Sequence, residues 1–213
     1  MSGLAERLAV MAITDPRART GTLEATRAAL RAGVPAIQLR WKNATAREIN
    51  DLGEALRRLT LDVGALLIVN DRVDIALAIG ADGAHLGDDD LPLPAARRIV
   101  PRAFVLGRSV DTAEEAAAAQ AQGADYVGLG PVFETGSKSG LGDAVGLEGI
   151  AEARRRVSVP IVAIGGLDEE RAAGAIAAGA AGVAVLAAIM HAHDPEAAAG
   201  KILAQTRKGR NSD

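Results

Sequence analysis

The chain has 213 residues and a formal net charge of −3, which suits one globular domain and argues against a surface that binds duplex nucleic acid. Hydrophobic residues make up 49% of it and aromatic residues only 2%, so few side chains could stack on bases. The absence of cysteine excludes disulfides, thiolate metal sites and cysteine nucleophiles. The first residues show no signal-peptide pattern and no apolar run has membrane-spanning length, so we expect a soluble cytoplasmic protein.

Short apolar runs alternate with longer, Ala-rich amphipathic stretches along the whole chain. The runs predict strands, in chain order, over 8–13, 36–39, 66–69, 83–86, 104–106, 125–129, 161–164 and 182–185. Helical stretches between them include 23–32, 46–59, 112–122, 169–178 and 196–207. The strand runs are apolar without alternation, which is typical of a parallel sheet that is buried on both faces.

Eight repeated strand–helix units favour a single (β/α)8 TIM barrel over residues 1–213. Glycines that stop helices precede four of the strands, at Gly33, Gly80, Gly123 and Gly179. The alternative is an open doubly wound sheet, but its G-x-G-x-x-G fingerprint does not follow the first strand. The polar tail 208–213 is expected to be disordered.

Polar residues follow the predicted strands, and in a barrel those positions converge on one mouth where chemistry takes place. They are Gln38-Leu39-Arg40-Trp41-Lys42, Asn70-Asp71-Arg72, His85-Leu86-Gly87-Asp88-Asp89-Asp90, Gly107-Arg108-Ser109, the run from Gly130 to Lys138, Gly165-Gly166 and Leu186-Ala187. Each group alone has a simpler interpretation. The acidic run suits a solvated turn, His85 a hydrogen-bonded packing residue and Trp41 a packing residue near the rim. The convergence of all seven favours a site.

The residue types at this mouth indicate two kinds of chemistry. A glycine pair at Gly165-Gly166, with the backbone of Leu186-Ala187, suits the phosphate cradle that such barrels place after strands seven and eight. Asp71 and one carboxylate of the 88–90 run suit Mg2+, which prefers oxygen ligands and substrate phosphates. Arg40, Lys42 and Lys138 could bind the remaining negative charge. The set indicates two phosphorylated substrates, one of them a pyrophosphate.

In its ordered motifs the chain resembles the thiamine phosphate synthase family from about residue 8 to residue 199. The motifs are Gln38-Leu39-Arg40-Trp41-Lys42, Asn70-Asp71-Arg72-Val73-Asp74, Gly83-Ala84-His85-Leu86-Gly87 with Asp90, Gly128-Leu129-Gly130-Pro131-Val132-Phe133 and Ile164-Gly165-Gly166. The resemblance implies a transferase that joins hydroxymethylpyrimidine pyrophosphate to a thiazole phosphate and releases pyrophosphate. It implies Asp71 and Asp90 as Mg2+ ligands.

The resemblance also assigns substrate-binding positions in the two halves of the site. Gln38, Arg40, Lys42, Asn70, Ser109 and Lys138 match the binders of the pyrimidine pyrophosphate, and we expect Arg40, Lys42, Ser109 and Lys138 to act in catalysis. Thr135, Ser137, Gly166, Leu186 and Ala187 match the positions that hold the thiazole phosphate. Neutralised pyrophosphate leaves readily, and the thiazole nitrogen can then attack the pyrimidine methylene cation, so no protein nucleophile is needed.

Some positions depart from the synthase pattern and keep other functions open. The stretch Thr135-Gly136-Ser137-Lys138, then Ser139-Gly140, departs from the synthase motif. The loop from Val132 to Leu141 and the run Gly107-Arg108-Ser109-Val110 resemble the sister family of TenI thiazole tautomerases. Ala187 replaces a usual serine and Asp88 a usual glutamine. A tautomerase needs an acid–base group, and the resemblance places its histidine at Asp111, which we expect instead to cap the following helix. The alternatives are a tautomerase, a catalytically silent regulatory sister, or another phosphosugar or indole barrel.

Overall fold

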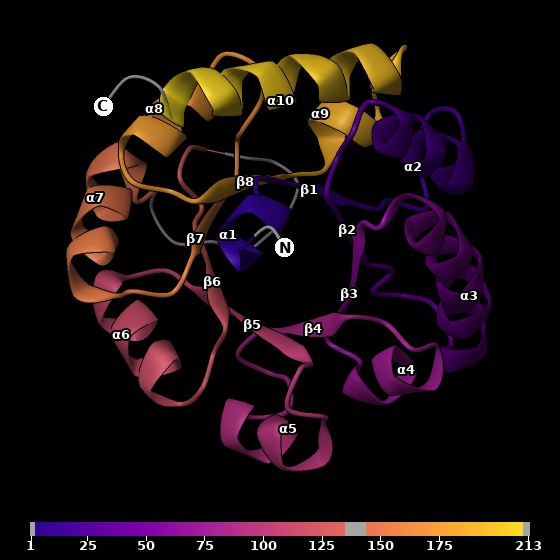
Figure 1. Cartoon of the computed structure of the whole chain (residues 1–213), viewed down its shortest axis with the longest axis horizontal. Helices are drawn as coiled ribbons and strands as arrows, with labels where there is room; N and C mark the ends of the chain where they lie inside the picture. Colours follow the sequence, from indigo (N-terminus) through magenta and orange to yellow (C-terminus); the bar gives the residue numbers. More distant parts are fainter. Residues whose placement is uncertain (1–2, 135–143, 211–213) are drawn as a thin grey trace.

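The computed structural model describes residues 3–134 and 144–210 (Figure 1). Eight parallel strands close into one barrel in sequence order, with β8 paired to β1. The strands are β1 (Val10–Ile13), β2 (Ala36–Leu39), β3 (Leu66–Asn70), β4 (Gly83–Leu86), β5 (Val105–Val110), β6 (Tyr126–Leu129), β7 (Ile161–Ile164) and β8 (Gly182–Val185). The predicted (β/α)8 fold is therefore confirmed.

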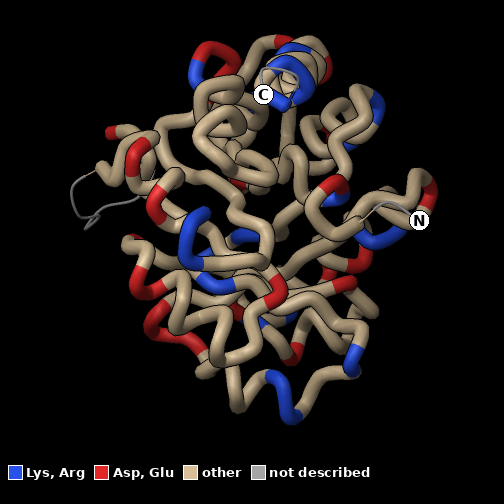
Figure 2. The backbone as a smooth tube through the Cα atoms, turned by 60° about the vertical axis from the view of Figure 1, so that its left-hand side comes forward, with Lys and Arg blue, Asp and Glu red and all other residues tan. Residues whose placement is uncertain are grey.

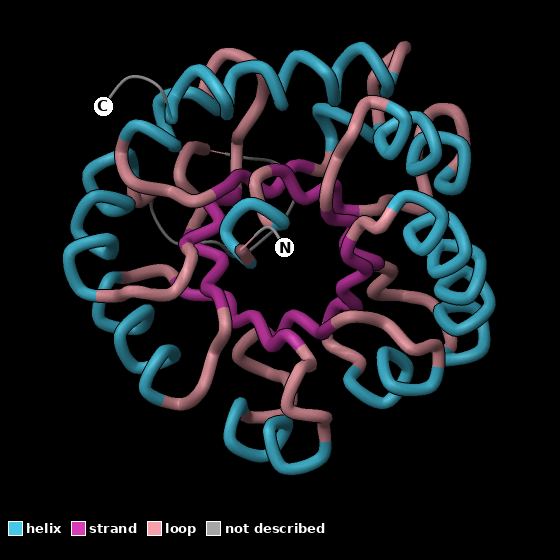
Figure 3. The backbone as a smooth tube through the Cα atoms, in the orientation of Figure 1, coloured by secondary structure: helices cyan, strands magenta, loops and turns pink. Residues whose placement is uncertain are grey.

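Helices form a ring outside the strands (Figure 3). They are α2 (Thr22–Arg31), α3 (Ala46–Val63), α4 (Val73–Ala78), α5 (Leu93–Ile99), α6 (Ala113–Ala121), α7 (Gly146–Arg156), α8 (Ala172–Ala177), α9 (Ala187–Met190) and α10 (Pro195–Arg210). A short helix before the first strand, α1 (Leu4–Arg7), places Leu4 against the apolar cluster inside the barrel. The helical side of the sheet and the barrel interior are thus both covered.

Several predicted boundaries need correction. The first strand begins at Val10 rather than at residue 8, because Leu4–Arg7 form a helical turn that extends to Leu8. The fifth strand continues to Val110, so Gly107-Arg108-Ser109 lie within it rather than beyond it. The prediction of a disordered tail from residue 208 is wrong for its first part, because α10 continues to Arg210 and Gly209 is buried. Residues 211–213 lie outside the described residues.

The core consists of two layers separated by the barrel wall. Met11, Ile68 and Val162 belong to a cluster inside the barrel, and Tyr126 joins them. A much larger cluster of Ala, Val, Leu and Ile fills the space between strands and helices. Small alanines let helices approach the sheet closely, which explains why so few aromatic residues are needed. The strands are nearly all buried on both sides, as their unbroken apolar runs predicted.

The helix ends follow the chemistry that the sequence indicated. The φ angles of Gly33, Gly80, Gly123 and Gly179 are 94°, 63°, 96° and 108°, a region that favours glycine, so the four predicted helix stops are confirmed.

Acidic and basic residues are interleaved along the outer helices (Figure 2). Within residues 3–134 and 144–210, no helix combines the length and apolar character that crossing a bilayer requires.

Candidate active site

One cavity of about 330 Å³ opens at the carboxyl ends of the strands. It brings together ten predicted site residues from six of the βα units, namely Gln38, Arg40, Lys42, Asn70, Asp71, Asp90, Ser109, Gly166, Leu186 and Ala187. Thr135, Ser137 and Lys138 lie outside the described residues. The convergence that was predicted from strand order is confirmed in position for the other ten, whereas their roles stay predictions.

Two carboxylates face each other at one side of the cavity. Asp71 follows β3 and shares a hydrogen bond with Asp90 of the β4–α5 loop. Burial raises the pKa of Asp71 to about 6, helped by that hydrogen bond and by the negative charge of Asp90, while Lys42 and Arg40 act in the opposite direction. A pair of close carboxylates that resist joint ionisation is stabilised by a bound cation, which removes their repulsion.

The backbone holds Asp71 in an unusual conformation. Asp71 has a φ of 66°, and no other described residue except glycine has a positive φ. Its N–H donates to the carbonyl of His85 on β4 at 2.8 Å, which fixes the conformation. Aspartate tolerates this region better than most residues, but the cost still indicates that the direction of the side chain matters.

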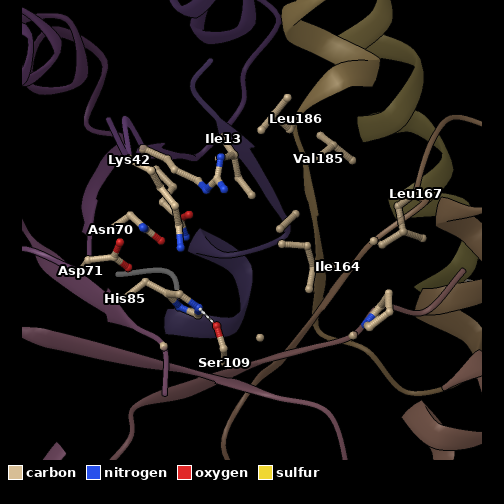
Figure 4. Close-up of a pocket in the computed structure, with 18 of the residues that line it drawn as sticks. Ile13, Lys42, Asn70, Asp71, His85, Ser109, Ile164, Leu167, Val185 and Leu186 are labelled. Carbon is tan, nitrogen blue, oxygen red and sulfur yellow. Dashed lines mark hydrogen bonds between the residues drawn. The ribbon is translucent and has the colours of Figure 1, made fainter. Parts of the chain in front are cut away.

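Arginine and lysine lie beside the acidic pair. Figure 4 shows the side chains of Lys42, Asn70 and Asp71 close together on one wall of the cavity. The backbone of Arg40 is held by Thr14 beyond β1, whose hydroxyl accepts from the Arg40 N–H at 2.9 Å. The exposed Lys42 and the half-buried Arg40 both act electrostatically on Asp71. This wall therefore combines the ligands for a hard cation with the cations that suit a polyphosphate.

The β4–α5 loop that carries Asp90 is anchored from β5. The Arg108 guanidinium donates to the carbonyl of Gly87 and to Asp88 Oδ1, the second contact at 2.6 Å. Asp90 Oδ2 accepts from the Gly87 N–H at 2.6 Å. Of the three acidic residues in this run, Asp88 is thus paired with Arg108, and Asp90 is the one turned toward Asp71.

The opposite side of the cavity is a glycine-rich wall. Gly165 and Gly166 have φ angles of 93° and 62°, and a Cβ on Gly166 would lie 2.7 Å from the Glu134 carbonyl oxygen. Arg171 donates to the Gly166 carbonyl at 2.7 Å and holds this turn in place. Leu186 and Ala187, at the start of α9, line the same side of the cavity, and the first N–H groups of a helix have no partner within it. This arrangement suits an anion such as phosphate.

The predicted cap at Asp111 is wrong. Thr112 is the residue before α6, and its hydroxyl accepts from the Glu115 N–H at 3.1 Å. The Asp111 N–H donates to the Glu115 carboxylate at 2.7 Å, so Asp111 contributes a backbone donor while Thr112 takes the capping role expected for aspartate. Asp111 is exposed and lies at the rim of the cavity.

Two packing predictions are confirmed, and one residue was missed. His85 is buried and lies within hydrogen-bond distance of Tyr126 and Ser109, and Trp41 packs against the outer core. Tyr126 was not singled out, although it reaches the polar side chains beneath the cavity. It is the only tyrosine of the chain, and its place between apolar residues of a central strand was the available signal.

The comparisons with known proteins agree with this geometry. A family model described as thiamine monophosphate synthase matches residues 10–189. The chain belongs to that family. A thiamine-phosphate synthase of Moorella thermoacetica is 52% identical over 181 residues, which cover 85% of this chain and 86% of the relative. One from Methanoculleus marisnigri is 50% identical over 186 residues, or 87% and 88% of the two chains.

Solved structures of the family show the same architecture. The thiamine phosphate pyrophosphorylase of Pyrococcus furiosus superposes with a TM-score of 0.90 at 40% identity and covers 97% of this chain and 99% of its own. The relatives above are named as synthases, so the comparisons identify this member of the family as an enzyme and do not favour the tautomerase or the silent sister. The resemblance predicted from the ordered motifs is confirmed.

Proposed function

We propose that the protein condenses hydroxymethylpyrimidine pyrophosphate with a thiazole phosphate to give thiamine phosphate and pyrophosphate. The observation that carries this proposal is the division of one cavity into two unlike walls. One wall holds Arg40, Lys42 and the facing carboxylates, and the other holds the glycine pair and the start of α9. A site for two phosphorylated substrates needs both.

The acidic pair fits Mg2+ as the resident metal. Asp71 and Asp90 supply two carboxylates, and within the described ranges no cluster of three or more His, Cys, Asp or Glu side chains could hold a metal. Mg2+ commonly takes only one or two carboxylates and completes its shell with water and substrate phosphates. When bound, Mg2+ would neutralise charge on the departing pyrophosphate.

The basic wall would favour departure of pyrophosphate. Arg40 and Lys42 would bind its oxygens through charge-assisted hydrogen bonds that strengthen as negative charge develops. Asn70 and Ser109 would add neutral donors, and Gln38 would orient the pyrimidine at the floor of the cavity. Lys138 would contribute another cation, as the family resemblance implies for its position.

The glycine wall would hold the second substrate. Backbone N–H groups at Gly166, Leu186 and Ala187 would bind the thiazole phosphate, together with Thr135 and Ser137 as the resemblance implies. With both substrates held, the bond from the pyrimidine methylene carbon to pyrophosphate would break first, and the thiazole nitrogen would then attack the methylene cation. Positioning and charge neutralisation supply the catalysis, and no side chain forms a covalent bond to the substrate.

The decisive experiment incubates the purified protein with both substrates and Mg2+ and follows thiamine phosphate and pyrophosphate together. We expect equal amounts of the two products, and no product when either substrate is omitted. Chelation by EDTA should abolish turnover, and added Mg2+ should restore it. Full turnover in EDTA would remove the metal from the proposal, and absence of thiamine phosphate with all components present would remove the function.

We also infer that a single domain in the cytoplasm carries this activity. The eight strands form one closed barrel that contributes both walls of the cavity, which supports a single unit. Both substrates are small phosphorylated molecules, and no nucleic acid or membrane partner is needed for the reaction. Limited proteolysis that left the barrel as one protected fragment would agree with this organisation.

A further inference from the structure

A chain of buried polar side chains runs across the floor of the cavity. Tyr126, Gln38 and His85 are 1%, 4% and 8% exposed, and they come from β6, β2 and β4. The Tyr126 hydroxyl lies 2.9 Å from His85 Nδ1, and His85 Nε2 lies 3.0 Å from Ser109 Oγ on β5. Gln38, His85 and Ser109 line the cavity, and Figure 4 shows the contact between His85 and Ser109 there. Four strands therefore contribute to one continuous chain.

The barrel wall leaves room for both rings by using glycine. A Cβ on Gly107 would lie 2.1 Å from Tyr126 Cζ, and a Cβ on Gly128 would lie 2.9 Å from His85 Cε1. The two rings lie with centroids 5.5 Å apart. Any larger residue at either position would displace a ring, so the sequence of β5 and β6 is matched to this arrangement.

The hydrogen-bond donors of these buried side chains point in one direction, from Tyr126 through His85 toward Ser109. The Gln38 amide nitrogen faces the Met11 sulfur at 3.4 Å, an orientation that suits an N–H group because sulfur is a weak acceptor. Burial raises the pKa of Tyr126, and a hydrogen bond from Gln38 lowers it by less, so the phenol keeps its proton. A buried O–H group without an acceptor costs free energy, and His85 Nδ1 lies 2.9 Å from the phenolic oxygen, so the hydroxyl hydrogen of Tyr126 points to His85 Nδ1.

The same reasoning extends to Ser109. A neutral imidazole has one N–H, and if Nδ1 accepts from Tyr126 then Nε2 carries the hydrogen. Nε2 then donates to Ser109 Oγ, and the serine hydrogen must turn away from His85 toward the cavity. An outward O–H can donate to an anionic oxygen, whereas the opposite arrangement would present only lone pairs.

We propose that Tyr126 is a positioning residue that acts through His85 to make the Ser109 hydroxyl a hydrogen-bond donor toward the phosphorylated pyrimidine substrate. The last part rests on the proposed function, because it takes that substrate as the ligand of this wall. The polarity itself is a property of the free protein. The two parts can therefore be tested separately.

The polarity is tested by the tautomer of His85 in the free protein, measured by 15N NMR of the imidazole nitrogens. The chain has three histidines, and His85→Gln identifies the relevant signals. We expect the hydrogen on Nε2 in the wild type and a mixture of tautomers in Tyr126→Phe, which keeps the ring and removes the hydroxyl. A hydrogen on Nδ1 alone in the wild type, or an unchanged tautomer in Tyr126→Phe, would overturn the proposal.

The consequence for the substrate is tested by kinetics. Tyr126→Phe should raise the KM for the pyrimidine pyrophosphate about tenfold and change the KM for the thiazole phosphate less than twofold, because only one wall loses an oriented donor. In a Ser109→Ala background the same change should have no further effect, since the donor that Tyr126 orients is already gone. Additive effects of the two changes would contradict the coupling.

A matched control separates orientation from stability. Thr206 of α10 is 1% exposed and donates to the Leu203 carbonyl at 2.9 Å, far from the cavity. Thr206→Val also removes a buried hydroxyl and should lower thermal stability without changing either KM. Should the wild type form no thiamine phosphate at all, the proposed function fails, and the NMR result still decides the polarity.

Discussion

Replacing Asp71 by Asn should stabilise the metal-free protein while it removes most of the activity. The folded state raises the pKa of Asp71 from 3.8 to about 6, so the folded chain holds this proton more tightly than the unfolded chain. Ionisation of Asp71 therefore lowers the free energy of unfolding. This destabilisation is absent below pH 3.8, grows as the pH rises from 3.8 to about 6, and is complete above about 6. Asparagine keeps the shape of the side chain and tolerates the positive φ at this position.

The magnitude follows from the size of the pKa shift. At about 1.4 kcal/mol per pKa unit, the whole shift corresponds to about 3 kcal/mol at neutral pH and above. Hydrogen bonds rearrange in the variant and Asp90 keeps its charge, so we expect a gain of about 1–2 kcal/mol. For a chain of this size that gain is about 3–6 °C in Tm at pH 8, and it should vanish at pH 4. Turnover should fall about hundredfold.

The assay is thermal unfolding at pH 4 and pH 8, with EDTA or with Mg2+, for the wild type, Asp71→Asn and a control. Asp51→Asn, on the exposed side of α3, removes one carboxylate charge away from the cavity and should change Tm little. Mg2+ should raise the Tm of the wild type and of the control, but not that of Asp71→Asn. If Asp71→Asn were less stable than the wild type in EDTA at pH 8, repulsion within the acidic pair could not be the dominant effect.

Four further substitutions test three separate parts of the site. Arg108→Met should weaken binding of Mg2+ with inorganic pyrophosphate about three- to tenfold by calorimetry, because the loop that carries Asp90 loses its anchor; unchanged affinity would show that the loop needs no such support. Lys42→Ala and Lys138→Ala should each raise the KM for the pyrimidine pyrophosphate at least about tenfold and leave that for the thiazole phosphate unchanged; equal effects on both substrates would contradict the two-wall division. Asp111→Asn should keep synthase activity within about threefold, and the wild type should not tautomerise thiazole phosphate alone; rapid tautomerisation that Asp111→Asn abolishes would favour the sister activity.

The architecture could be predicted because it follows from repeated local signals. Apolar runs without alternation gave the strands, and glycines at 33, 80, 123 and 179 gave helix ends. The convergence of the site followed from the rule that the carboxyl ends of parallel strands share one mouth. These inferences needed no knowledge of side-chain contacts, which explains why they hold for residues as far apart as Gln38 and Ala187.

The errors arose where two local signals competed. The predicted fifth strand ended at residue 106, because Gly107, Arg108 and Ser109 lack apolar character. In the structure, pairing with β4 and β6 extends this strand to Val110. The cap of α6 was assigned to Asp111, but the Thr112 hydroxyl caps the helix one residue later, and the Glu115 carboxylate accepts from the Asp111 N–H. Neither outcome can be read from single-residue preference, because each depends on which partner is within reach.

Several residues at this mouth have backbone conformations or buried environments that their residue type disfavours, and the family resemblance alone would not reveal this. Asp71 adopts a backbone conformation that every other described non-glycine residue avoids, and its carboxyl faces Asp90 at a cost to folding. Gln38 and His85 are polar groups buried in a wall of aliphatic strands. A sequence selected for stability alone would remove all of these features, so their concentration around one cavity is independent physical evidence that this end of the barrel is where the protein acts.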